Sequence, residues 1–284
     1  MTEPVAPPTC YRHPGRETYV RCTRCERPIC PDCMVSASVG FQCPECVSAG
    51  NASVRQPRTT YGGTVRSGDG LVTRVLIGAN VALFLIELLI GIDQVTARYG
   101  LQPVKIAHGE YYRLITAGFL HASVFHILFN MLALFWLGTP LEARLGRSRY
   151  LLVYAMSLIG GSIVSFCFSP FTIIGVGASG AIFGLMGAFV VVAWKQKLDI
   201  RPFLWLIGLN LVIGFLPGTN IDWRAHVGGL LTGAVMALAI VLPKPEHRRV
   251  VLATTTVLVL VVLAGAMVWR INDLQPVVHA VFGP

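Results

Sequence analysis

The strongest constraint on this chain is a series of seven apolar segments, each close to the length that crosses a lipid bilayer. They cover about residues 71–92, 122–139, 149–168, 177–194, 202–216, 225–242 and 250–269. A membrane-spanning helix needs roughly 20 mainly apolar residues. Only 13% of the 284 residues are charged, against about 25% in an ordinary soluble domain. The sequence therefore predicts an all-α polytopic membrane protein, whose fifth segment is short and opens at Pro202.

Basic residues fall unevenly between the loops that join these segments. Lys and Arg gather before segment one and between segments two and three, four and five, and six and seven, whereas 169–176 has none and 217–224 has only Arg224. Cytoplasmic loops carry the excess of Lys and Arg in membrane proteins. The pattern predicts a multi-pass protein of the plasma (cell) membrane with a cytoplasmic N-terminus and an external C-terminus. The net charge of +9 is then a topology signal, and no nucleic-acid partner is expected.

Composition divides the chain into four regions. Residues 1–48 form a small domain that holds seven of the eight cysteines, and residues 49–70 lack apolar periodicity, which is typical of a flexible linker. Six helices over 71–245 form the membrane core, and 246–284 add a seventh helix and a short external tail. No cleavable signal peptide is expected, because residues 1–70 are polar.

Four polar residues fall at one depth near the external face of this topology. Ser179 lies just inside the outer end of the fourth segment, and His226 lies at the outer end of the sixth. His126 and Asn130 lie in the first turns of the second. A lone polar residue in a membrane helix usually bonds a neighbouring helix for structural reasons. Shared depth instead allows Ser179 and His226 to act as a nucleophile and its base, which indicates intramembrane proteolysis.

Small residues beside this pair allow their helices to approach each other. Two stripes at four-residue intervals are present: Ala225, Gly229, Gly233 and Ala237 on the sixth segment, and Gly180, Gly184 and Ala188 on the fourth. Such stripes permit close backbone contact in lipid. We therefore expect these two helices to pack together and bring Ser179 within hydrogen-bonding reach of His226.

His126 and Asn130 are four residues apart and so share one helix face. An acyl-transfer site needs hydrogen-bond donors aimed at the developing oxyanion. We assign oxyanion stabilisation to this pair, with the Ser179 backbone N–H as a further donor. The alternative is that the pair only ties helices together. Glu87, in the middle of the first segment, is expected to be protonated or bonded to a neighbouring helix rather than catalytic.

Motifs in this order resemble the rhomboid intramembrane serine protease family over roughly residues 71–245. Gly177-Ala178-Ser179-Gly180 is similar to the family's GxSG nucleophile motif, and 225–229 (AHVGG) to its catalytic-histidine motif. The stretch 121–130 (HASVFHILFN) resembles the HxxxN element that helps form the oxyanion hole, and 142–146 (EARLG) resembles the turn after it. The resemblance implies a six-helix core, a Ser–His dyad without an acid, no cofactor for catalysis, and membrane-anchored protein substrates.

Three features differ from the family's usual pattern. Tyr112-Arg113 stands where the first external loop usually has Trp-Arg, and Phe183 stands where many members have a Tyr that packs on the catalytic histidine. The seventh segment resembles the subgroup with one helix added after the core. Asp222, four residues before His226, is the nearest carboxylate available to orient the imidazole, although the family works without one.

The N-terminal cysteines form four pairs with metal-ligand spacing: Cys10-x2-His13, Cys22-x2-Cys25, Cys30-x2-Cys33 and Cys43-x2-Cys46. Eight ligands match two tetrahedral zinc sites. A disulfide framework is the alternative, but seven cysteines are an odd number and the topology places them in a reducing cytosol. We therefore expect two structural Zn²⁺ ions, which supply folding energy to a domain with little core.

The same segment resembles a B-box-like zinc-finger domain, in which alternate pairs share a metal. The resemblance implies one site made by Cys10, His13, Cys30 and Cys33, and a second made by Cys22, Cys25, Cys43 and Cys46. Such domains more often bind proteins than catalyse reactions, so a cytosolic protein partner is expected.

Together these features predict a serine endopeptidase that works in the lipid bilayer and cleaves membrane-anchored proteins in or near their transmembrane segments. The substrate is expected to reach the site from the lipid, between the second and fifth helices. The rival function is a catalytically silent rhomboid-like scaffold that binds membrane proteins. Inactive relatives typically lack the serine or the histidine, and this chain has both. A transporter is disfavoured because no inverted repeat is visible.

Overall fold

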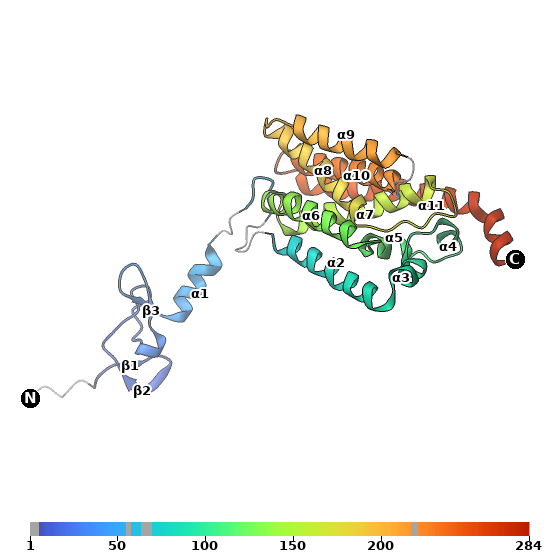
Figure 1. Cartoon of the computed structure of the whole chain (residues 1–284). Coiled ribbons are helices and arrows are strands. Elements are labelled where there is room, and N and C mark those ends of the chain that lie inside the picture. The colour runs from blue at the N-terminus through green and yellow to red at the C-terminus, as the bar shows by residue number, and fades with distance from the viewer. Residues whose placement is uncertain (1–5, 55–57, 64–69, 217–220, 284) are drawn as a thin grey trace, which may run out of the picture. The chain divides into compact units, whose positions relative to one another are not determined.

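A computed structural model describes residues 6–54, 58–63, 70–216 and 221–283 (Figure 1). The chain divides into two compact units, residues 1–57 and 58–284. Parts of the predicted linker 49–70 and of the predicted loop 217–224 lie outside the described residues.

The first unit is a small fold built around its cysteines. Its elements are β1 (Thr9–Cys10), β2 (His13–Glu17), the 3-10 helix η1 (Pro31–Cys33), β3 (Val35–Ser36), β4 (Phe41–Gln42) and α1 (Pro44–Ser53). β1 pairs with β2 and β3 with β4, both antiparallel. The buried apolar cluster consists of Ile29 and cysteines. This core is too small to hold a fold by apolar burial alone.

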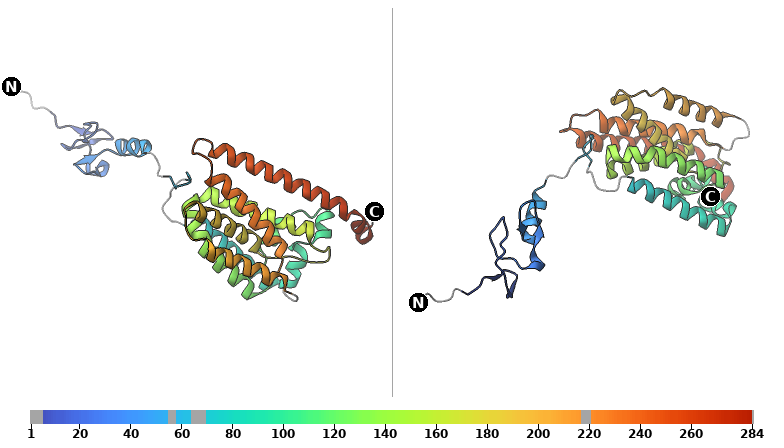
Figure 2. Two further views of the ribbon diagram at one scale, coloured as in Figure 1. Left: turned by 90° about the horizontal axis from the view of Figure 1, so that it is seen from above. Right: turned by 60° about the vertical axis from the view of Figure 1, so that its left-hand side comes forward.

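The second unit is a bundle of long helices joined by short ones (Figure 2). Its elements are α2 (Leu71–Ile90), α3 (Ile92–Tyr99), α4 (Pro103–Ala107), α5 (Arg113–Thr116), η2 (Ala117–Phe119), α6 (Val124–Leu145), α7 (Arg147–Phe168), α8 (Ser179–Lys195), α9 (Arg201–Phe215), α10 (Trp223–Val241) and α11 (Arg248–Phe282). Each of the seven predicted apolar segments is a helix.

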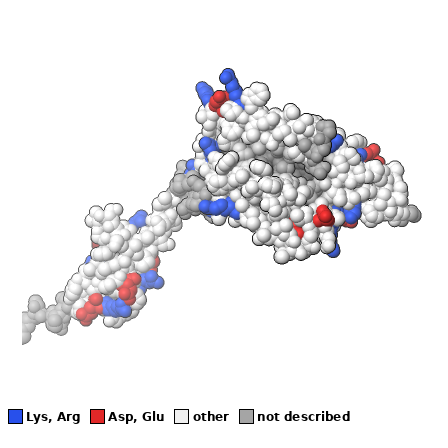
Figure 3. Space-filling model, in the orientation of Figure 1, with Lys and Arg blue, Asp and Glu red and all other residues white. Residues whose placement is uncertain are grey.

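Five of these helices are long and apolar enough to cross a membrane: α2, α6, α7, α10 and α11. The helices α8 and α9 are apolar but shorter, at 17 and 15 residues. Figure 3 shows Lys and Arg at the two ends of this unit and a broad band without charge between them. That is the distribution expected of an integral membrane protein, because a charge at the bilayer centre is costly.

Backbone contact between α8 and α10 forms the centre of the bundle. A Cβ added to Gly229 would lie 1.9 Å from the Gly180 carbonyl oxygen, and one added to Gly233 would lie 2.0 Å from the Gly184 carbonyl oxygen. The two predicted stripes therefore meet. α7 joins this contact, since a Cβ on Gly161 would lie 2.8 Å from the Ala225 carbonyl oxygen. Only glycine allows three helices to approach so closely.

The seventh helix is longer than the segment 250–269 indicates. α11 continues to Phe282, so the region expected to be a short tail is helical. The extension packs against the α3–α5 region: Leu274 and Val278 are buried in a cluster with Val104 and Ile106, and the Phe282 ring stacks on His108 at 4.1 Å. These tertiary contacts stabilise helical turns that hydropathy alone does not identify.

Two described parts of the predicted flexible linker have regular structure that its composition does not indicate. α1 extends to Ser53. Residues 58–63 form a turn in which Thr59 N–H donates to the Gly63 carbonyl oxygen at 2.8 Å. Tyr61 in that turn is only 4% exposed and packs into the main apolar cluster of the bundle. Burial of one aromatic ring thus fixes a turn in a stretch without apolar periodicity.

Replacing Gly229 with Ala tests the central contact. The added methyl group must push α8 and α10 apart, so we expect a loss of about 1–3 kcal/mol or more in the free energy of unfolding. Gly265→Ala in α11 is the matched control, because nothing lies within 4 Å of its added Cβ and alanine favours helix. Melting of both variants in detergent measures the difference. Equal melting temperatures would contradict the packing described here.

Candidate functional site

Ser179 and His226 lie side by side where α8 and α10 begin. Ser179 is the first residue of α8 and His226 lies in the first turn of α10. Ser179 Oγ is 2.9 Å from His226 Nε2. The Gly180–Gly229 contact lies directly beneath them, and it holds the two helix ends at this separation. A hydroxyl and an imidazole at this distance can exchange a proton.

The His226 ring is held by stacking rather than by an acid. Phe183 lies parallel to it, with ring centroids 4.0 Å apart and an interplanar angle of 9°. His226 is 6% exposed, and its Nδ1 has no hydrogen-bond partner in the described part of the chain. Asp222 does not orient the ring: one carboxylate oxygen accepts from the N–H groups of Arg224 and Ala225. The other accepts from the Ser165 hydroxyl.

His126 faces the same space from α6. The Ala122 N–H lies 3.4 Å from His126 Nδ1 and donates to it, which leaves the ring proton on Nε2. A Cβ placed on Gly177 would lie 2.9 Å from His126 Nε2 and 3.5 Å from Ser179 Oγ. The absence of a side chain at Gly177 therefore keeps open a space that both groups border. Gly177 has a φ of +133°, which also favours glycine.

Asn130 lies one turn further along α6. Its Nδ2 donates to the His126 carbonyl oxygen at 2.9 Å, and the residue is 7% exposed. This bond positions the amide on the site-facing side of the helix. The structure thus brings together all four polar residues that the sequence places at one depth.

A cavity of about 580 Å³ opens onto these groups. Ser179, His226, His126 and Asn130 all line it. Its wall includes Phe129 from α6 and Asn210 from α9, while the only buried residues of α9 are Ile207 and Gly214. The cavity is large enough for a peptide side chain and adjacent backbone.

The short helices before α6 fix the loop that leads into Ser179. Leu101 and Gly175 exchange two backbone hydrogen bonds of 2.9 and 2.8 Å, and Gly177 N–H donates to the Ala117 carbonyl oxygen. Arg113 is 1% exposed and donates to the Gly100 carbonyl oxygen at 2.7 Å. From its buried position, Arg113 therefore supports the Gly100–Leu101 segment, which pairs with Gly175 in the loop before Ser179. The family resemblance singled out Arg113 in the sequence, whereas no sequence motif indicates that Leu101 supports this loop.

Two acids noted in the sequence have structural partners. Glu87 accepts a hydrogen bond from the His121 N–H at 3.1 Å, which agrees with a bond from this acid to a neighbouring segment. Glu142 accepts from the N–H groups of Val72 and Thr73 at 2.9 Å each. A carboxylate on the free N–H groups of a helix start is favourable. Glu142 therefore joins the end of α6 to the start of α2.

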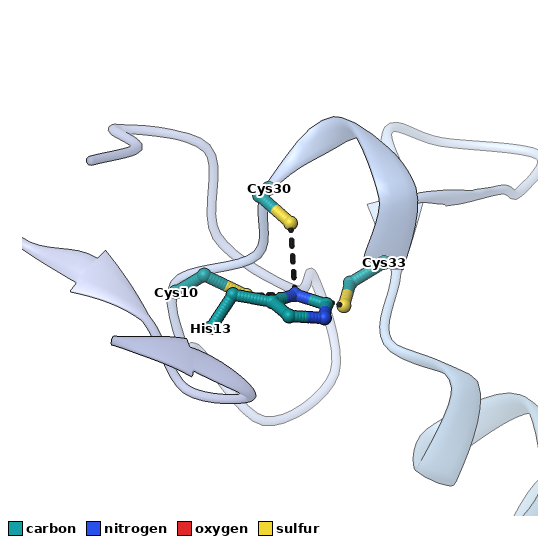
Figure 4. Close-up of side chains that lie close together, drawn as sticks. All are labelled: Cys10, His13, Cys30 and Cys33. Atoms are coloured by element: carbon teal, nitrogen blue, oxygen red, sulfur yellow. Dashed lines mark hydrogen bonds between the residues drawn. The ribbon is translucent and has the colours of Figure 1, made fainter. Parts of the chain in front are cut away.

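In the first unit, four ligand atoms converge around one point (Figure 4). They belong to Cys10, His13, Cys30 and Cys33. His13 Nδ1 lies 3.7, 3.3 and 3.4 Å from the three sulfurs. A tetrahedral zinc ion with bonds of about 2.1–2.3 Å has ligand–ligand edges of roughly 3.5–3.8 Å. The cluster therefore fits such an ion.

A second cluster gathers Cys22, Cys25, Cys43 and Cys46. Every thiol of the unit is free of a disulfide. Burial acts against ionisation, but backbone N–H donors lower the pKa of the Cys22 thiol to about 6. A hydrogen bond from Arg27 lowers the pKa of Cys25. Metal binding requires thiolates, so the surroundings suit a metal. The grouping joins the first pair with the third and the second with the fourth.

Comparisons with known proteins point to one family. The rhomboid domain model matches residues 108–243. The chain is 37% identical over 200 residues to "Rhomboid protease GluP" of Bacillus subtilis (strain 168), covering 66% of this chain and 38% of that protein. It is 43% identical over 150 residues to "RHOMBOID-like protein 6, mitochondrial" of Arabidopsis thaliana, covering 50% and 48%.

A shorter relative is covered more fully. The chain is 38% identical over 148 residues to "Putative rhomboid protease YdcA" of Bacillus subtilis (strain 168), covering 50% of this chain and 73% of that protein. The first two relatives are matched over less than half of their own length. The matched rhomboid domain contains α6 to α10 and with them all four residues of the site, and the chain belongs to the rhomboid family.

Proposed function

We propose that this protein is an intramembrane serine protease with Ser179 as nucleophile and His226 as general base. The observation that carries the proposal is the 2.9 Å approach of Ser179 Oγ to His226 Nε2 at a cavity inside an apolar helix bundle. The names of two relatives, which call one a rhomboid protease and another a putative one, support it.

The reaction follows from the two side chains. The Ser179 hydroxyl passes its proton to His226 Nε2 while Oγ attacks the scissile carbonyl carbon. The protonated imidazole then gives that proton to the departing amine, which leaves an acyl-serine. Water, deprotonated by the same nitrogen, releases the acid and restores the hydroxyl. Phe183 keeps the imidazole plane fixed throughout, in the place of an orienting acid.

Three groups are the proposed donors to the oxyanion. His126 presents Nε2–H, because its Nδ1 is occupied by the Ala122 N–H. The Ser179 N–H has no intrahelical partner, since it is the first residue of α8. Asn130 supplies an amide one turn away on the same side of α6. Donors that are already in place stabilise negative charge without reorganisation.

The substrate is a membrane-anchored protein that approaches from the lipid between α6 and α9. The cavity wall formed by Phe129 and Asn210 lies on that route, and α9 has few buried residues to hold it. The Lys and Arg pattern supports a cytoplasmic N-terminus. With the plasma membrane as the proposed location, this orientation puts the active site near the external face. A substrate helix must unwind there to expose its carbonyl, so small residues near the cleavage site are favoured.

The first test removes the dyad. Ser179→Ala and His226→Ala should each lower cleavage of a generic single-span substrate by on the order of 10⁴ or more, with insertion intact. Because the two residues act as one unit, the double variant should be no slower than either single one. Thr254→Ala, which removes an exposed hydroxyl of α11 that does not line the cavity, is the control. Near-normal activity in either single variant would reject the dyad, and a wild type inactive on every substrate would favour the scaffold function.

The second test addresses the oxyanion donors. His126→Ala should lower turnover by on the order of 10²–10³ while affecting substrate binding less. Asn130→Ala should act in the same direction, with a smaller effect if the other two donors compensate. Separate kcat and KM values measure this difference. A selective loss of binding with unchanged turnover would instead assign these residues to docking or helix packing.

We also propose that the two clusters of the first unit hold structural Zn²⁺ ions and that this unit binds a cytosolic protein. The ligand distances support tetrahedral sites, and bound zinc would supply the folding energy that the small core lacks. Neither cluster contributes to peptide-bond cleavage in this proposal. A variant lacking residues 1–57, the first compact unit, should therefore keep its dyad chemistry, whereas the turn 58–63 must stay because it packs in the bundle.

Cysteine variants test the metal assignment one site at a time. Elemental analysis of the intact chain should find two zinc ions. Cys30→Ser should remove the first and Cys22→Ser the second. Cys167→Ser is the control, because this eighth cysteine is buried on α7 and packs against α11. A zinc content unchanged by both ligand variants, or fewer than two ions in the wild type, would reject the sites.

A further inference from the structure

Four arginines gather at one end of the helix bundle, outside the site described above. Arg149 lies in the first turn of α7, and Arg248 and Arg249 begin α11. Arg58 lies in the turn 58–63. Guanidinium nitrogens of Arg149 and Arg248 lie 3.2 and 3.4 Å from the position that a Cβ on Gly62 would occupy. Two like charges are thus held beside the same glycine.

Among the described residues, no carboxylate forms an ion pair with these charges. The charged groups that act on Arg149 are Arg248, Arg249 and Arg58, all of the same sign. Five ion pairs form in the described part of the chain, and none includes any of the four arginines. The nearby Arg147 differs, since it lies 3.8 Å from Glu142. Like charges are tolerated this close together only if a bound anion or solvent offsets their repulsion.

The backbone adds to the positive potential. α7 and α11 both begin here, and neither has a side-chain cap: Gly146 and His247 make no capping hydrogen bond. Uncapped helix starts present free N–H groups that attract anions. The Arg248 Nε is also buried and has no partner among the described residues. A donor without an acceptor in this position points to a ligand.

Two of the four arginines, Arg149 and Arg248, are held in place before any ligand binds. Arg149 donates to the Tyr61 carbonyl oxygen, and the Arg248 guanidinium lies 5.9 Å from the Tyr61 ring centroid. The Tyr61 ring is buried, and Gly63 fits so closely that an added Cβ would lie 2.3 Å from the Leu145 carbonyl oxygen. The turn 58–63 therefore packs tightly against the bundle and holds the guanidinium groups of Arg149 and Arg248 beside Gly62.

We propose that this arginine cluster binds the phosphate of an anionic phospholipid headgroup. The ligand class follows from the place: the cluster lies at the ends of apolar helices, where a spanning protein meets the headgroup layer. Arginine recognises phosphate through paired N–H donors. Bound lipid would neutralise the cluster and add to the contacts that hold the turn 58–63 on the bundle.

Lipid retention tests this site. The full-length protein, purified in a neutral detergent, is titrated with phosphatidylglycerol or phosphatidylcholine, and bound lipid is counted by native mass spectrometry. We expect the wild type to retain phosphatidylglycerol. The double variant Arg149→Gln/Arg248→Gln should bind this lipid roughly 30-fold more weakly, because it lacks two positive charges that attract an anionic headgroup. Arg144→Gln/Arg201→Gln removes the same charge from other helix ends and should retain the lipid. Arg149→Lys/Arg248→Lys keeps the charge and separates a binding defect from misfolding.

Two further measurements decide whether the bound phosphate belongs to a lipid and whether the site prefers an anionic headgroup. Inorganic phosphate at millimolar concentration should compete only weakly, since it lacks the acyl chains that sit against the helices. Equal retention by the Gln variant and its control would overturn the proposal. Binding of inorganic phosphate with no preference between the two lipids would overturn the lipid assignment.

Discussion

The contact between the backbones of α8 and α10 is the interaction on which the rest of this structure depends. Membrane helices gain little from apolar burial against one another, because lipid is as apolar as they are. Their association depends instead on dispersion contact between closely packed backbones, and such contact needs helix faces without bulky side chains. Gly180 against Gly229 and Gly184 against Gly233 supply such surfaces. Ser179 and His226 come shortly before this contact on their helices, so the packing that stabilises the bundle also sets the separation of their side chains.

Much of this could be predicted from the sequence because membrane constraints are local. Hydropathy identified every long helix, and the four-residue spacing of glycines identified the face that packs. The topology placed Ser179 and His226 at one depth, and the structure adds the 2.9 Å distance. Cysteine spacing grouped the ligands into pairs, since a CxxC turn is itself a local structure. These signals lie within one turn or one helix, where a single sequence is informative.

Features that depend on distant contacts could not be predicted. The helical extension after residue 270 exists because Leu274 and Val278 find apolar partners on α4, more than 160 residues earlier. Tyr61 looks like part of a disordered stretch until its ring meets the bundle. Asp222 is close to His226 in sequence, yet it accepts hydrogen bonds at the start of α10 and from Ser165. A helix start offers free N–H groups that compete with the imidazole for the carboxylate.

The consequence of that competition is that His226, the proposed base, is oriented without a carboxylate. His226 Nδ1 has no partner in the described residues, and Phe183 holds the ring plane. In a dyad of this kind, no carboxylate stabilises the imidazolium that forms during proton transfer. The proposed mechanism therefore places more of the stabilisation on the oxyanion side, where His126, the start of α8 and Asn130 converge. Because those donors come from α6 and α8 while the base comes from α10, helix packing decides whether the site is assembled.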